Sequence, residues 1–181
     1  MLTDRGSAIF LLPLLSVAGI MGRMLPHQPN ATPTAALALV AGAALGMRSA
    51  LLLPMIVLMA TDLFLGTYEP LVMVSVYACM AIPAFVGSNL IGERRKPLVI
   101  AGSAAICSGI FFIVTNFAVW ASGEWYDRTF AGLVACYTAA LPFFRNMLAA
   151  DLLWSGVLFT GLALIESYRI EIAAHHSLRA E

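Results

Sequence analysis

Charged residues are scarce in this chain. Only 11% of its 181 residues are charged, against 61% hydrophobic residues, and this composition is typical of integral membrane proteins and not of soluble domains. The basic and acidic residues balance to a formal net charge of zero, so no basic surface indicates nucleic acid as a partner. We therefore expect a single transmembrane domain over residues 1–181, with the lipid bilayer as its surroundings.

Disulfides and nucleotide-binding motifs are missing as well. The three cysteines, Cys79, Cys107 and Cys136, lie in apolar sequence, and an odd number without loop cysteines argues against a disulfide framework. The chain has no GxxxxGK[ST] phosphate loop, so we expect no ATP hydrolysis of its own. It also lacks HExxH spacing and a Ser-His or Cys-His pairing for catalysis, and we expect no intrinsic cofactor.

Long apolar runs are abundant. Six of them predict transmembrane helices, although the second and third fall short of the usual ~20 residues and have to extend into their flanks. The six runs cover about residues 8–22, 34–47, 51–66, 71–91, 98–120 and 147–166. The expected fold class is an all-α integral membrane protein with six transmembrane helices.

The segment 121–146 is harder to assign, because it joins a polar turn to a moderately apolar stretch. We interpret it as an outer interfacial segment, either separate or continuous with the sixth span after Pro142. A true seventh span is the competing interpretation. Residues 167–181 are expected to form a cytoplasmic tail.

Basic residues between the spans predict the orientation. The larger group is Arg5, Arg48, Arg94, Arg95, Lys96, Arg169 and Arg179, and the smaller group is Arg23, Arg128 and Arg145. Cytoplasmic loops carry the excess of Lys and Arg. We therefore expect the larger group, and both termini, on the cytoplasmic side.

Polar side chains inside the spans collect in the outer half under this orientation. Such groups are costly in lipid and usually mark a substrate path. The inner half offers almost none, which argues against a pore or a proton relay. The sequence therefore predicts a pocket that opens outward, and its candidate substrate-binding residues are His27, Gln28, Asn30, Asp62, Asn116, Arg145 and Asp151.

Structural roles compete with these assignments. A buried cysteine is commonly packed as a small hydrophobe. Asp62 and Asp151 could each pair with Arg145 or cap a broken helix, and His27 could be a hydrated loop residue between two prolines. Small residues at every fourth position from 38 to 46 predict close helix packing, with a docking surface for a partner membrane protein as the alternative.

Four segments together resemble the BtuM-type vitamin B12 transporters, which are similar to the S-components of energy-coupling factor (ECF) transporters. The segments are RMLPHQPNATP at 23–33, DLFLG at 62–66, TNFAVW at 115–120 and AALPFFRN at 139–146. The resemblance implies a six-helix S-component-like bundle in the bacterial cytoplasmic (inner) membrane that binds cobalamin from the outer side.

The resemblance also implies a cysteine thiolate as axial ligand of the corrinoid cobalt, with the vitamin in its base-off form. Cys79, in the outer half of the fourth span, matches that position, and His27 would face the corrin from the solvent side. A thiolate is a soft donor suited to a transition metal. Because a strong donor weakens the bond on the opposite face, decyanation of cyanocobalamin is a further expectation, with Cys79 as its catalytic residue.

Two points stay open. The first span lacks a clear series of alanines for docking an ECF energising module, which favours solitary operation. The rival functions are an S-component-like binder of another vitamin or metal chelate, and a non-transport membrane factor.

Overall fold

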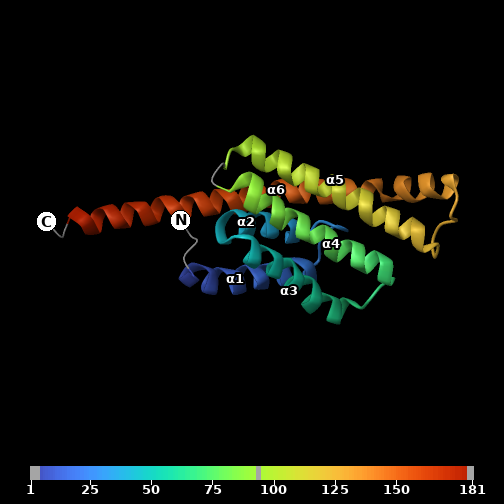
Figure 1. The fold of residues 1–181 in the computed structure, drawn as a ribbon, viewed down its shortest axis with the longest axis horizontal. Helices are drawn as coiled ribbons and strands as arrows, with labels where there is room; N and C mark the ends of the chain where they lie inside the picture. The colour runs from blue at the N-terminus through green and yellow to red at the C-terminus, as the bar shows by residue number, and fades with distance from the viewer. Residues whose placement is uncertain (1–4, 93–94, 179–181) are drawn as a thin grey trace.

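Helices account for every regular element in the part of the chain that the structure, a computed structural model, describes: residues 5–92 and 95–178. They are α1 (Arg5–Met24), α2 (Thr34–Leu45), α3 (Met47–Leu65), α4 (Pro70–Val86), the π-helix η1 (Gly87–Ile91), α5 (Pro97–Ser122) and α6 (Phe130–Leu178). Figure 1 shows an elongated bundle in which α5 and α6 lie side by side as the longest hairpin. The all-helical prediction is confirmed.

The helices alternate in direction, so their connections gather at two ends of the bundle (Figure 1). The loop end consists of residues 25–33, 66–69 and 123–129. The basic end consists of Gly46, Gly92, Arg95 and Lys96, and the start of α1 lies toward it. Of the residues used to predict orientation, Arg94 and Arg179 lie outside the described ranges.

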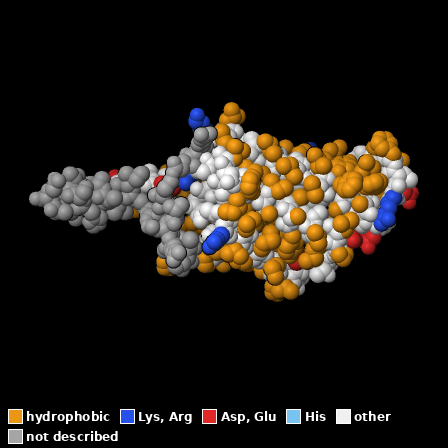
Figure 2. Space-filling view, in the orientation of Figure 1, with side chains coloured by type: hydrophobic (Ala, Val, Ile, Leu, Met, Phe, Trp, Pro, Cys, Tyr) orange, Lys and Arg blue, Asp and Glu red, His pale blue; other side chains and the backbone are white. Residues whose placement is uncertain are grey.

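Four helices are long and apolar enough to cross a membrane. They are Met47–Leu65, Pro70–Ile91, Pro97–Ser122 and the Phe130–Tyr168 part of α6, while Phe10–Met24 and Thr34–Leu45 are shorter apolar helices. Figure 2 shows apolar side chains over most of the visible face, with the charged side chains mainly toward the ends. The chain is therefore a membrane-embedded helical protein. The crossing of lipid by all six helices stays a prediction.

Helix α2 is the centre of the bundle. It has only 12 residues, most of them buried, and it contacts α1, α3, α4, α5 and α6. A Cβ atom at Gly42 would lie 2.5 Å from the carbonyl oxygen of Ala84, and one at Gly87 would lie 2.1 Å from that of Leu39. The glycines therefore let α2 approach α4 and η1 at backbone distance. Gly46 serves a different purpose, because its φ of 84° ends the helix.

Helix α6 differs most from the separate segments expected from the sequence. It runs without interruption for 49 residues through Pro142, and the connection from α5 is only residues 123–129. The stretch after residue 129 is thus continuous with the last predicted span, which was the second form of our interpretation. The predicted tail is helical as far as Leu178. A proline removes one backbone donor without necessarily ending a helix that neighbours support.

Candidate functional site: a polar cavity at the loop end

A cavity of about 300 Å³ lies below the α1–α2 loop and is enclosed by α2, α4, α5 and α6. Its polar wall comes mainly from the loop and the helix ends, and its apolar wall from the helices. The lining residues are Arg23, His27, Asn30, Thr32, Thr34, Ala35, Leu65, Tyr68, Val76, Met80, Phe111, Met147 and Asp151.

A second cavity, of about 200 Å³, adjoins the first on the side of α5 and α6. The two share Asn30, Val76, Phe111 and Met147 as lining residues. The second is also lined by Val72, Phe112, Thr115, Asn116, Val119, Ala140, Phe143 and Phe144. We call the two together the loop-end cavities.

Asp151 is the buried acidic group of the first cavity. It is 3% exposed, and the Ser108 hydroxyl on α5 donates a hydrogen bond of 2.7 Å to its Oδ2 atom. The same hydroxyl lies 3.0 Å from the Ala104 carbonyl oxygen. No salt bridge to Asp151 occurs among the described residues. A carboxylate at this depth suits a ligand that supplies a cation or an N–H donor.

Asp62 has a different environment. Arg23 Nη2 donates to its Oδ1 atom at 3.0 Å, and the Tyr77 hydroxyl donates to Oδ2 at 3.0 Å. The carboxylate is therefore saturated by protein groups from α1 and α4. Tyr68, in the α3–α4 connection, lines the first cavity, and its pKa is raised by burial and then by the nearby negative charge of Asp62.

The loop of residues 25–33 is held by short-range contacts. The ring nitrogens of His27 lie 2.8 Å from the Gln28 carbonyl oxygen and 3.2 Å from that of Arg23. Asn30 adopts a positive φ of 63°, a conformation that asparagine tolerates better than most residues. Asn146 Nδ2, on α6, donates to the Pro29 carbonyl oxygen at 3.4 Å. The loop is thus fastened at its tip to the wall of the cavity.

The first turn of α2 forms the floor of this region. Thr34 and Ala35 line the cavity, and the N-cap residue Pro33 offers no side-chain hydrogen bond. The first N–H groups of a helix have no partner within it and carry a partial positive charge. The floor therefore favours an electron-rich ligand group, while Asp151 beside it favours a donor.

The structure brings together four of the seven predicted substrate-binding residues. His27, Asn30, Asn116 and Asp151 line the loop-end cavities. Gln28 and Arg145 are exposed and line neither of them, and Asp62 is engaged by Arg23 and Tyr77. The sequence interpretation that Asp62 or Asp151 pairs with Arg145 is wrong for Asp62, whose cation is Arg23.

Cys79 lies near the cavities without lining them. It is 4% exposed, whereas its neighbours Val76 and Met80 form part of the wall. Seven residues make about two turns of an α-helix, so Cys79 continues the face of α4 that carries Val72, one level deeper. Its thiol is therefore positioned just below the floor of the second cavity.

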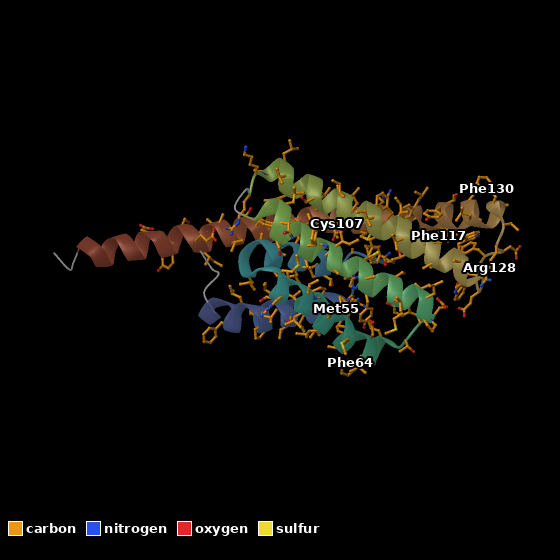
Figure 3. All side chains as sticks on the ribbon, in the orientation of Figure 1. Met55, Phe64, Cys107, Phe117, Arg128 and Phe130 are labelled. Carbon is orange, nitrogen blue, oxygen red and sulfur yellow. The ribbon has the colours of Figure 1, made fainter. Side chains whose placement is uncertain are left out.

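The other two cysteines are engaged in packing. Cys107 belongs to a core cluster with Leu39 and Phe159, and Figure 3 shows it well away from Arg128 at the loop end. Cys136 donates its S–H to the Asn116 carbonyl oxygen at 3.4 Å. Neither lines the loop-end cavities.

Sequence reasoning missed several residues of the site. Tyr68, Thr32 and Thr34 line the first cavity, and Ser108 and Tyr77 hold its acidic neighbours. The available signal was the set of hydroxyl groups in apolar runs, because a buried hydroxyl needs a partner as much as a carboxylate does. Hydroxyl residues are so common in transmembrane helices that this signal has little specificity.

Fold and site together define a small helical membrane protein with a polar cavity at one end of the bundle. Residues 3–174 match a family described as a family of unknown function (DUF6580), and the chain belongs to this family. No curated protein and no solved structure matches the chain.

Proposed function

We propose that this protein binds cobalamin in the loop-end cavities and carries it across the bacterial cytoplasmic membrane. The observation that supports this most is the convergence of the four segments that resemble BtuM-type transporters. Asn30 and Leu65 represent the first two segments in the first cavity, and Asn116 and Phe143 represent the other two in the second. Segments far apart in the chain meet at a single site.

In this proposal the six helices form an S-component-like bundle with the loop end facing outward and both termini in the cytoplasm. Arg95 and Lys96 then lie on the cytoplasmic side, as the positive-inside rule requires. The chain works alone, or with an ECF module that supplies ATP hydrolysis. The cavities open at the end from which an external vitamin arrives.

Cys79 is the proposed axial ligand of cobalt. Among the described residues, no three His, Cys, Asp or Glu side chains gather as a site for a bare metal ion. A corrinoid brings its own equatorial nitrogen ligands, so one soft donor is sufficient. With thiolate bound on one face, cyanide on the other leaves with its bonding electron pair, and water or His27 takes the vacated position.

Binding of so large a ligand requires the site to open. A corrin macrocycle exceeds a cavity of about 300 Å³, and the Cys79 thiol lies below the wall. The contacts that have to yield are the Asn146–Pro29 hydrogen bond and those of the His27 ring with its own backbone. These are few and local, so the loop 25–33 is the expected moving part.

A smaller vitamin or metal chelate is the second candidate ligand. The cavity volume favours it, because about 300 Å³ already falls at the lower end of ordinary ligand sites. In that case Asp151, and not Cys79, would make the decisive contact.

Titration of the detergent-purified protein with cyanocobalamin and aquocobalamin tests the proposal. We expect about one cobalamin per chain and co-elution of the red corrinoid. Ala35→Phe, which fills the first cavity, should abolish binding, whereas the matched change Ala101→Phe on α5 should not. Absence of heat and of co-eluting corrinoid with both forms would exclude cobalamin and leave the smaller ligand.

A further inference from the structure

A cavity of about 310 Å³ lies between α5 and α6 at the basic end. It shares no lining residue with the loop-end cavities. Its walls are mostly apolar or small, with Ile100, Leu152, Gly156 and Phe159 among them. A Cβ atom at Gly156 would meet nothing within 4 Å, so the groove is open at this point.

The groove has the length of one lipid leaflet. On α6 its lining extends from Leu152 to Ala163, which at ~1.5 Å per residue is about 16 Å. The hydrocarbon core of a bilayer is ~30 Å thick. A groove of half that thickness, ending at the polar end of two transmembrane helices, matches a single acyl chain.

The mouth of the groove is suited to an anion. Arg95 lies in its lining and bonds Glu166 and the Gly92 carbonyl oxygen, which neutralises part of its charge. Lys96 is exposed and makes no salt bridge among the described residues. Lys96 is also the N-cap of α5, whose first turn has no side-chain cap. Uncapped N–H groups and a lysine together favour phosphate.

We propose that this groove binds an anionic phospholipid of the surrounding membrane. One acyl chain lies along Ile100, Gly156 and Phe159, and the phosphate contacts Lys96, Arg95 and the first turn of α5. Basic pockets between transmembrane helices at a membrane surface are suited to this class of lipid. The site is independent of the loop-end cavities and of the proposed cargo.

A transmembrane helix of a second copy or another protein is the competing occupant. It would give a partner to the buried Ser155 hydroxyl, which has none among the described residues. The cationic mouth favours the lipid, because a helix surface in the bilayer brings no negative charge to Lys96.

The experiment compares dioleoyl-phosphatidylglycerol, dioleoyl-phosphatidylcholine and inorganic phosphate, each added to the detergent-purified full chain. Thermal unfolding and native mass spectrometry are the readouts. We expect phosphatidylglycerol to raise the unfolding temperature and to remain bound as one lipid per chain, with neither effect from the other two additives. Equal effects of the two lipids, or of phosphate alone, would overturn the proposal.

Two glycines on α6 supply a matched pair of variants. Neither Gly156 nor Gly161 has an atom within 4 Å of an added Cβ, but only Gly156 lines the groove. Gly156→Leu should weaken phosphatidylglycerol binding at least about tenfold, Gly161→Leu should leave it unchanged, and Lys96→Gln should weaken it. If Gly156→Leu instead keeps full lipid binding, the lipid lies elsewhere. Loss of a dimer in Gly156→Leu without loss of lipid binding would assign the groove to a helix.

Discussion

Arg23 and Asp62 join the end of α1 to the end of α3, with 3.0 Å between the Arg23 Nη2 and Asp62 Oδ1 atoms. The Tyr77 hydroxyl of α4 occupies the other carboxylate oxygen. One acidic side chain, 6% exposed, therefore connects three helices. Because Arg23 also lines the first cavity, this ion pair links the stability of the bundle to the shape of the site.

Removal of one partner of this pair should be strongly destabilising. Arg23→Gln leaves a buried carboxylate without its cation, and we expect a loss of about 3 kcal/mol in the free energy of unfolding. The double variant Arg23→Gln with Asp62→Asn should regain part of this loss. Unfolding of the detergent-purified variants measures both values, and additive single effects would show that the pair contributes no coupling energy.

Cys79→Ser should remove the thiolate bond to cobalt, since a hydroxyl is a poor donor to this metal. The visible spectrum of the bound vitamin should change, and release of cyanide from cyanocobalamin should stop. Cys107→Ser and Cys136→Ser are the controls, because neither residue lines the loop-end cavities. His27→Ala should alter the rate of release without removing the thiolate signature. Identical spectra in the parent and all three cysteine variants would exclude thiolate ligation.

Asp151→Asn should separate stability from ligand binding. Loss of a buried charge without a cation should keep or raise the unfolding temperature. Loss of the charge-assisted hydrogen bond to the ligand should lower its affinity about tenfold. Ser108→Ala is a companion variant, because it removes the 2.7 Å hydrogen bond but keeps the carboxylate. A more stable variant with unchanged affinity would show that Asp151 does not contact the ligand.

A cysteine at Gln28 should report the sidedness of the loop end. Gln28 is exposed, and the native cysteines at 79, 107 and 136 are all buried, so background labelling should be low. An impermeant thiol reagent should reach Gln28→Cys from the periplasm, and bound ligand should protect it. Lys96→Cys is the control at the basic end and should react only from the cytoplasm. The reverse pattern would overturn the proposed orientation.

Gly42→Ala should destabilise the bundle by about 1–3 kcal/mol. The added Cβ would lie 2.5 Å from the Ala84 carbonyl oxygen, so α2 and α4 have to move apart. Gly109→Ala is the matched control, since nothing lies within 4 Å of its added Cβ, and it should be neutral or stabilising by about 1 kcal/mol through helix propensity. Equal stability of the two variants would show that α2 can shift without cost.

Hydropathy predicted the helices because lipid requires continuous apolar segments with internally paired backbones. It failed at the boundary before the sixth span, where Arg145 and Asn146 suggest a break in the chain. The structure explains their tolerance: Arg145 is exposed, and Asn146 reaches the Pro29 carbonyl oxygen across the bundle. Polarity alone does not distinguish a helix end from a helix face directed toward a loop.

The site was predicted by depth but not by pairing. The layer containing Asp151, Asn116 and His27 follows from counting residues along each span, whereas the partner of Asp62 depends on which helix ends approach one another. Arg23 is 39 residues from Asp62 in the chain. Such a long-range pair requires the packing of α1 against α3, which no local pattern specifies.

The brevity of α2 has an electrical consequence. Its 12 residues span about 18 Å at ~1.5 Å per residue, well short of the ~30 Å of a bilayer core. Thr34 and Ala35, at its start, border the first cavity. Water in that cavity would concentrate the membrane potential over the remaining thickness, so a charged ligand held beside Thr34 would already have crossed part of the voltage drop before any helix moves.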